Sequence, residues 1–223
     1  LAAVDRGWTP DVGSKMATLG EAAGLLGLNV PPGFVITGAA YELLLAHNDL
    51  QPEIDRLIQT SDSDEPAEIF ALSSRLQQLV VHAEVPAALA NAIAEAYEAL
   101  AVTIGSRPAV ALRSSAVGED SPEASFAGQY ATELNIRPEH LVDAYRQVVA
   151  SKYSPQAMQY RLQRGLRDDW LAMCVGCMAM VDARAGGVAY TANPGDPTDR
   201  RVVISAALGL PKAVVDGRFV ADE

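Results

Sequence analysis

Apolar residues recur at helical spacing through the first half of the chain. In the first such segment, residues 15–26, the apolar side chains that share one face are Met16, Leu19, Ala22, Ala23 and Leu26. A stiff Pro-Pro-Gly turn then leads to a short apolar strand at 34–36, and Thr37 stands where it can cap the next helix. The same spacing predicts further helices over 41–45, 52–59, 67–82 and 86–102.

Hydrophobic patterning changes after residue 108. A short buried strand at 109–112 runs directly into Arg113-Ser114-Ser115-Ala116, and a small-residue loop, 117–128, precedes a strand at 130–136. Helices are predicted over 138–153 and 155–164, and strands over 173–181, 187–191, 202–205 and 213–219. Hairpin-length loops join the last strands, which favours antiparallel pairing. The pattern predicts an α+β fold with a helical front half and a strand-rich back half.

Composition narrows the classes of protein to which the chain can belong. Of its 223 residues 49% are hydrophobic, which is enough for a sizeable core. A net charge of −11 argues against a nucleic-acid surface, because that surface needs clustered cations. A run of about 18 apolar residues and a signal-peptide pattern are both missing, so no membrane contact is expected. Two cysteines fit a reducing cytoplasm, and the start at Leu1 rather than Met predicts a fragment of a longer protein.

The segment Arg113–Gly128 carries groups that suit polyanion binding. The guanidinium of Arg113 offers a fork of donors to phosphate oxygens, and serine hydroxyls and unhindered backbone N–H groups follow it. The alternative is a strand-end arginine that pairs with Glu119, Asp120 or Glu123. The local pattern leaves both interpretations open.

Gly13-Ser14-Lys15, at the start of the first predicted helix, is a second anion-binding candidate. A helix N-terminus attracts anions, and a lysine in the first turn opposes the helix dipole. A phosphate bound near Lys15 would offset this unfavourable interaction with the helix dipole. The segment is not a Walker A loop, which needs a preceding strand and a longer glycine frame.

The cysteines and histidines predict no metal site. Cys174 and Cys177 stand three residues apart on a predicted strand, so their thiols point to opposite faces and core packing is favoured. His47, His82 and His140 lie in separate helical segments, and no other cysteine pair exists to complete a zinc site.

Five segments share a recognisable order along the chain: VGSKMATLGEAAGLLGLNVPPGFVIT (12–37), VALRSSAVGEDSPEASFAGQYATELNI (110–136), SKYSPQAMQYR (151–161), VDARAGGVAYTANP (181–194) and VVISAALGLPKAVVDG (202–217). In this order they resemble the N-terminal ATP-binding domain of phosphoenolpyruvate synthase and pyruvate phosphate dikinase, which rifampin phosphotransferase shares. Arg-Ser-Ser-Ala followed by Ser-Phe-Ala-Gly-Gln is the most specific part. The resemblance covers nearly the whole chain.

The resemblance implies an ATP-grasp-like fold in which two lobes clamp ATP. Residues 1–166 would form a helix-rich first lobe with the phosphate-binding motifs, and 167–223 an incomplete, strand-rich part of the second lobe. Lys15 and Arg113 match the family residues that contact the phosphates and stabilise the transferring phosphoryl groups. They are therefore the expected catalytic residues.

The resemblance also implies contacts with the rest of the nucleotide. Gly128 lies in the matching lid, and Thr132 matches a threonine that contacts the nucleotide. The strand 174–181 matches the connector that binds adenine, with Met178 at a contact position and backbone groups of Ala179 and Val181 near the base.

As to function, the resemblance implies the ATP-binding part of a phosphoenolpyruvate synthase-like phosphotransferase. In the family the β-phosphoryl of ATP passes to a histidine on a separate domain, and a pyruvate-binding domain then uses it. Mg²⁺ is expected with ATP, held by ligands beyond the segment that matches 202–217. The chain contains neither partner domain, so it is expected not to complete a catalytic cycle alone.

Three departures from the family pattern leave alternatives open. Met16 and Met178 replace a usual glycine and glutamine, and Pro211-Lys212 replaces Gly-Glu. One alternative is a non-catalytic nucleotide-sensing module. Another is a rifampin phosphotransferase-like antibiotic kinase, because this domain does not choose the acceptor. The edge of an incomplete sheet also leaves a homodimer open.

Overall fold

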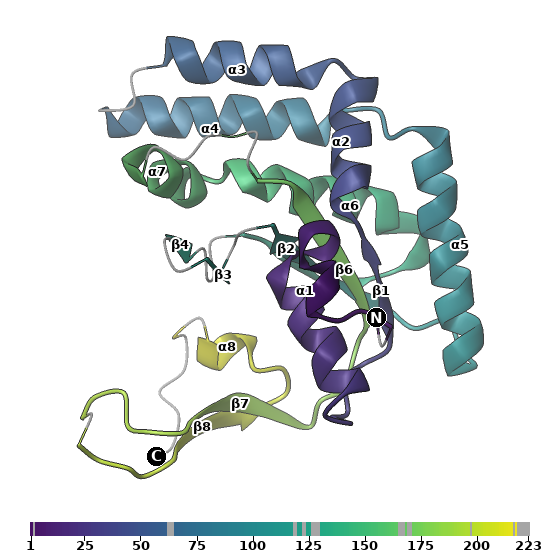
Figure 1. Cartoon of the computed structure of the whole chain (residues 1–223), viewed down its shortest axis with the longest axis vertical. Helices are drawn as coiled ribbons and strands as arrows, with labels where there is room; N and C mark the ends of the chain where they lie inside the picture. The colour runs from purple at the N-terminus through teal and green to yellow at the C-terminus, as the bar shows by residue number, and fades with distance from the viewer. Residues whose placement is uncertain are drawn as a thin grey trace. The chain divides into compact units, whose positions relative to one another are not determined.

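The chain divides into two compact units, Leu1–Met180 and Val181–Glu223, in a computed structural model. The structure describes all residues except 2, 62–64, 118–119, 122–123, 126–129, 165–167, 169–170, 197, 216 and 218–223. Each unit is described by itself (Figure 1).

An antiparallel sheet forms the centre of the first unit, with strands in the order β1-β6-β2-β5. Its strands are β1 (Gly33–Ile36), β6 (Met173–Ala179), β2 (Val110–Ala116) and β5 (Thr132–Ile136). The strand that comes last in the sequence, β6, therefore lies between two earlier ones (Figure 1). A separate two-residue ladder joins β3 (Asp120–Ser121) to β4 (Ala124–Ser125).

One face of this sheet belongs to the main hydrophobic core. Because side chains alternate along a strand, Leu112 on β2 and Val175 and Cys177 on β6 enter this core. The helices around it are α2 (Gly38–His47), α3 (Leu50–Thr60), α4 (Pro66–Val81), α5 (Ala87–Ile104), α6 (Leu141–Ala150) and α7 (Pro155–Arg164). Short 3₁₀ turns, η2 (Pro138–His140) and η3 (Ser151–Tyr153), flank α6.

Helical periodicity explains how these helices bury one side. On α3 the buried residues are Leu50, Ile54 and Leu57, which follow the i, i+4, i+7 spacing of one helical face. The predicted helices of the front half are thus present. Thr37 stands at the N-cap position of α2, but its side chain makes no capping hydrogen bond.

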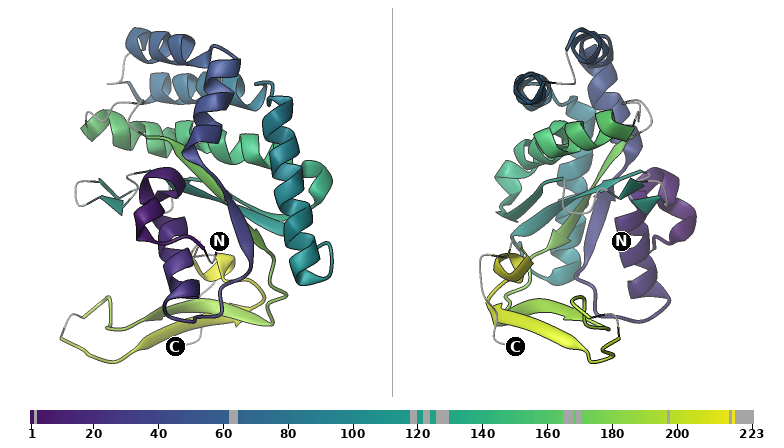
Figure 2. Two further views of the ribbon diagram at one scale, coloured as in Figure 1. Left: turned by 45° about the vertical axis from the view of Figure 1, so that its right-hand side comes forward. Right: turned by 90° about the vertical axis from the view of Figure 1, so that its left-hand side faces the viewer.

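The opposite face of the sheet carries α1 (Thr9–Gly24), which follows the 3₁₀ turn η1 (Arg6–Trp8). Val12, Met16 and Ala17 of α1 form a small second core, against which Val35 of β1 packs. Figure 2 shows α1 on the side of the sheet opposite to α6. The sheet of the first unit is therefore covered on both faces.

The second unit contains a β-hairpin and a short helix. Strands β7 (Ala185–Tyr190) and β8 (Val203–Leu208) pair antiparallel, and α8 (Lys212–Val215) follows. Gly209 turns the chain out of β8 with φ +86°, and its N–H donates to the carbonyl of Arg184 at 3.0 Å. Pro211 then packs against Gly186, and its carbonyl accepts from the N–H groups of Val214 and Val215 in α8.

The mixed fold with antiparallel sheets confirms the α+β prediction, but the predicted division at 166/167 is wrong. β6 pairs along its length with β2, so it belongs to the sheet of the first unit, and the division falls after Met180. The change from helical to strand periodicity near 167 reflects a switch of secondary structure within one unit.

Two local predictions are also wrong. The segment 213–219 was expected to be a strand, but 213–215 belong to α8 and most of the remainder lies outside the described residues. Arg113 was expected at the end of a strand, whereas β2 continues through Ala116. The small and polar residues of Arg-Ser-Ser-Ala obscured a strand that pairs on both sides.

Within the part of the chain that the structure describes, α5 is long and apolar enough to cross a membrane by length and composition alone. A core helix passes the same test. Leu89, Ile93, Tyr97 and Leu100 of α5 are buried in the main core, and Glu95 and Glu98 lie on its exposed side. The finding is therefore weak evidence for a membrane span.

Candidate functional site

Arg113 lies in the middle of β2, in register with Thr132 of β5 on one side and Gly176 of β6 on the other. Residues directly opposite each other in an antiparallel pair point to the same face. Arg113 and Thr132 therefore stand next to each other on the face that carries α1. Both side chains are exposed, so a cationic fork and a hydroxyl are available there to a ligand.

A break in α1 begins the helical turn that holds Lys15. Gly13 has φ 74° and ψ 161°, so a new helical segment starts at Ser14, as the sequence predicts for Gly13-Ser14-Lys15. A Cβ on Gly13 would lie 2.0 Å from the carbonyl oxygen of Ser115. Only glycine combines this backbone conformation with so close an approach to β2.

Three further contacts fix this turn on the strands beside Arg113. The N–H of Met16 donates to the hydroxyl of Ser115 at 3.2 Å. The Met16 side chain is fully buried, and a Cβ on Gly176 would lie 2.1 Å from its sulfur. The thiol of Cys174 donates to the carbonyl oxygen of Asp11 at 3.2 Å. Half-buried Lys15 thus lies on a turn that is packed against the strands carrying Arg113 and Gly176.

The predicted adenine connector is divided between two faces and two units. Met178 is in register with Ala111 of β2, so it shares the face of Arg113, where it is buried. Ala179 is in register with Val110 on the opposite face, and its N–H donates to the carbonyl of Pro32 at 2.9 Å. That N–H would have to leave Pro32 before it could pair with a base.

The other predicted contacts are not part of this arrangement. Val181 belongs to the second unit, where its carbonyl accepts from the N–H of Ala183 at 3.0 Å. Gly128 lies outside the described residues. The alternative partners of Arg113, namely Glu119, Asp120 and Glu123, lie in a stretch whose side chains the structure does not describe.

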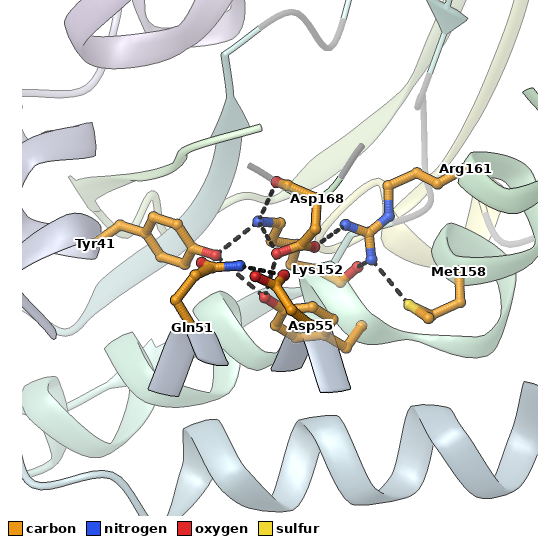
Figure 3. Close-up of polar contacts among 8 residues, drawn as sticks. Tyr41, Gln51, Asp55, Lys152, Met158, Arg161 and Asp168 are labelled. Carbon is orange, nitrogen blue, oxygen red and sulfur yellow. Dashed lines mark hydrogen bonds and ion pairs between the residues drawn. The ribbon is translucent and has the colours of Figure 1, made fainter. Parts of the chain in front are cut away.

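A buried ionic cluster lies on the other side of the sheet, among the helices (Figure 3). The carboxylate of Asp168 accepts from Arg161 Nη1 at 2.5 Å and from Lys152 Nζ at 3.2 Å. The side chains of Lys152, Arg161 and Asp168 are 1%, 4% and 6% exposed. Tyr153 donates to the same carboxylate at 3.0 Å, and Lys152 donates to the hydroxyl of Tyr41 at 2.6 Å.

The electrostatics of this cluster favour ionised Asp168. Burial opposes its ionisation, but the charges and hydrogen bonds of Lys152 and Arg161 outweigh that effect and lower its pKa. Burial is the main reason that the pKa values of Tyr41 and Tyr153 are raised, and the negative charge of Asp168 raises both further. These phenols therefore stay protonated and able to donate. The cluster ties together α2, η3, α7 and the segment before β6.

The sequence pattern did not predict this cluster, although one signal for it is present. Leu141, Ala144 and Val148 form the apolar stripe of α6, and Lys152 continues that stripe one turn later. A charged residue on an apolar stripe indicates a buried partner. The partner, Asp168, could not be identified because the pattern does not show which acidic residue of the chain reaches it.

The cysteines behave as core residues. Cys174 and Cys177 are free and buried, and burial raises the pKa of each thiol to about 12. They lie on opposite faces of β6, as predicted, since Cys177 joins the main core and Cys174 lies beneath α1. Among the described residues, no three His, Cys, Asp or Glu side chains gather into a metal site.

An open groove of about 810 Å³ runs between α3 and α4 and contains none of the predicted site residues. It is lined by Asn48, Leu50, Glu53, Arg56, Leu57, Ser74, Arg75, Gln78, Leu79, His82 and Ala83. The candidate nucleotide site is instead the open part of the sheet face beside α1.

Comparison with known families gives a match over residues 9–223 to the pyruvate phosphate dikinase AMP/ATP-binding domain. The chain is 38% identical over 212 residues to a probable phosphoenolpyruvate synthase of Methanothermobacter thermautotrophicus, covering 94% of the chain and 31% of that relative. It is 36% identical over 219 residues to the phosphoenolpyruvate synthase of Neisseria meningitidis, covering 95% of the chain and 28% of the relative.

A third relative matches along the whole chain. The phosphoenolpyruvate synthase of Aeropyrum pernix is 34% identical over 225 residues, which cover 100% of the chain and 27% of the relative. The chain therefore spans less than a third of the length of these curated relatives.

Proposed function

The chain belongs to the pyruvate phosphate dikinase AMP/ATP-binding domain family, and we propose that it is the ATP-binding part of a phosphoenolpyruvate synthase-like phosphotransferase. One observation carries the proposal. The register of β2 and β5 places Arg113 beside Thr132, on the face where the turn that holds Lys15 is packed. Three groups that suit a polyphosphate thus come from segments far apart in the sequence.

In the proposed complex, each of these residues has a distinct task. The ammonium of Lys15 and the guanidinium of Arg113 hold the phosphates, and the hydroxyl of Thr132 adds a hydrogen bond. Arg113 extends from a central strand, so its position is set by the sheet before the nucleotide arrives. Phosphoryl transfer depends mainly on positioning and on donors placed where charge develops, which suits this rigid support.

The remaining parts of the proposal concern the longer protein. The β-phosphoryl of ATP would pass to a histidine on another domain and then to pyruvate on a third. The β7–β8 hairpin and α8 would contribute to the second lobe of an ATP-grasp-like clamp, and Met178 and the backbone at Ala179 and Val181 would lie near adenine. The family lid at Gly128 would close over the phosphates.

Mg²⁺ would accompany ATP and neutralise charge on the transferring phosphoryl group. Its ligands are proposed to lie beyond the segment 202–217, and no three His, Cys, Asp or Glu side chains gather among the described residues.

Calorimetric titration of the chain with ATP tests the proposal. Loss of a charge-assisted hydrogen bond costs about 1.5–3 kcal/mol, so Lys15→Ala and Arg113→Ala should each raise the Kd about tenfold or more. Arg75→Ala removes an exposed arginine from α4 and is the matched control, with an unchanged Kd expected.

Two results would contradict the proposal. One is that the unaltered chain does not bind ATP. The other is that both site variants bind ATP as tightly as the Arg75→Ala control.

A further inference from the structure

The helical segment that begins at Ser14 has a glycine at its N-cap position. The first backbone N–H groups of a helix have no partner within the helix, and a side chain at the N-cap usually accepts from the second or third of them. Here the N-cap position is Gly13, which has no side chain. One of these N–H groups is that of Met16, the third residue of the segment.

Ser115 supplies the missing acceptor from the middle of β2. Its hydroxyl accepts from the N–H of Met16 at 3.2 Å across a sequence separation of 99 residues. The Ser115 side chain is fully buried, so water does not compete for this contact. Gly13 packs directly on the carbonyl of the same serine, which leaves the hydroxyl well placed beside the helix terminus.

We propose that Ser115 is a positioning residue for nucleotide binding: it caps the turn that holds Lys15 and fixes that turn relative to Arg113. This inference rests on the proposed ATP-binding function. Ser115 and Arg113 are two residues apart on one strand and face the same side of the sheet. One strand therefore carries both the phosphate-binding arginine and the cap of the turn that holds the phosphate-binding lysine.

The capping contact also engages one backbone donor of this turn. A helix N-terminus often binds phosphate through its free backbone N–H groups. The N–H of Met16 already donates to Ser115. That N–H is therefore not offered to a phosphate, and in the proposed complex the turn contributes the ammonium of Lys15, whose reach depends on where Ser115 holds the helix.

Amide hydrogen exchange tests the capping role without any nucleotide. In Ser115→Ala, the N–H of Met16 should exchange about 2- to 30-fold faster, the range expected for loss of an N-cap. The matched control is Ser73→Ala on α4, which removes a buried hydroxyl bonded to the carbonyl of Tyr153 at 2.6 Å. Exchange at Met16 should not change in that variant beyond the effect of its global stability.

A double-mutant cycle with Lys15→Ala tests the positioning role. Ser115→Ala should raise the Kd for ATP about 2- to 30-fold when Lys15 is present, and should leave it unchanged when Lys15 is already alanine. Equal losses in both backgrounds would overturn the inference, because Ser115 would then act independently of Lys15. Ser73→Ala should leave the Kd unchanged.

The outcomes separate the two proposals. Unchanged exchange at Met16 in Ser115→Ala overturns the capping inference even if ATP binds. Failure of the unaltered chain to bind ATP overturns the proposed function and, with it, the positioning role. If Ser115→Ala does not fold, Ser115→Cys keeps a side chain of similar size with a weaker acceptor, and a smaller increase in the same exchange rate is expected.

Discussion

Asp168 connects several elements of the first unit from an almost fully buried position. Its carboxylate accepts from Lys152, Tyr153 and Arg161, and Lys152 extends the network to Tyr41 on α2. These hydrogen bonds and ion pairs offset much of the cost of removing the charges from water. Removal of the carboxylate would leave two buried cations with neutral partners, which is far more costly than the loss of a surface ion pair.

At this residue we predict that Asp168→Asn destabilises the chain by about 3–5 kcal/mol, the range for breaking a buried ion pair. Denaturant unfolding at neutral pH measures the change. The control is Asp143→Asn, which breaks the exposed pair with Arg146 and should cost about 1 kcal/mol or less. Similar losses in the two variants would show that the buried cluster does not stabilise the fold.

The pH dependence of the unaltered chain follows from the same cluster. The pKa of Asp168 is lower in the folded than in the unfolded chain, so this carboxylate stabilises the fold above its ordinary pKa of 3.8. That contribution is lost as the pH falls from 3.8 through the lowered folded value. Asp168→Asn should therefore show a shallower loss of stability over this acidic range.

Among the secondary-structure elements, helices could be predicted well and strand pairing could not. Apolar spacing is a local signal, so α3, α4 and α7 follow from it within one or two residues. The place of β6 between β1 and β2 depends on pairing across the whole unit, which local periodicity does not contain. The same limit hid the extension of β2 through Ala116, because it is the pairing with β6 that makes this polar segment a strand.

In the candidate site, too, a contact between segments distant in sequence could not be predicted from local periodicity. The family resemblance predicts Lys15, Arg113 and Thr132 as nucleotide contacts, and it marks Met16 as a departure from the usual glycine. It could not show that Met16 packs directly on Gly176, because the two residues lie on α1 and β6. Space left by the missing side chain of Gly176 is filled by that of Met16.

At the scale of these two elements we predict that Gly176→Ala is destabilising and that Met16→Ala partly rescues it. The added methyl would lie 2.1 Å from the Met16 sulfur, and overpacking of this kind costs about 1–3 kcal/mol. Denaturant unfolding of both single variants and of the double variant measures the coupling. The control is Gly195→Ala, where the nearest atom of another residue is 3.4 Å away.

Additive losses of stability in the double variant would contradict this prediction. If the losses of Met16→Ala and Gly176→Ala sum in the double variant, the two residues do not constrain each other. The packing of α1 on β6 would then have to depend on other contacts.

For the whole molecule, the first unit contains the elements needed for its own stability. The last residue in the sequence that belongs to either core cluster of the described structure is Cys177. The described strands of the main sheet, β1, β2, β5 and β6, and helices α1–α7 also precede Val181. The second unit, by contrast, is built on a two-stranded hairpin, which is marginally stable by itself.

We therefore predict that a chain ending at Met180 folds and unfolds at nearly the same temperature as the full 223 residues. Thermal unfolding followed by circular dichroism checks this. A chain ending at 166, the boundary expected from the sequence, provides the comparison, and it should fail to fold because it lacks β6. A large drop in Tm for the chain ending at Met180 would show that the first unit depends on the second.

The position of β6 between β1 and β2 also has a consequence for biosynthesis. A ribosome produces β1 and β2 well before β6, and at about 5–20 residues per second the interval between β1 and β6 is on the order of ten seconds. During that time β1 lacks its sheet partner, because in the described sheet it lies at the edge and pairs with β6. Early helices can form as they emerge, but the sheet that supports Arg113 closes only when β6 has been translated.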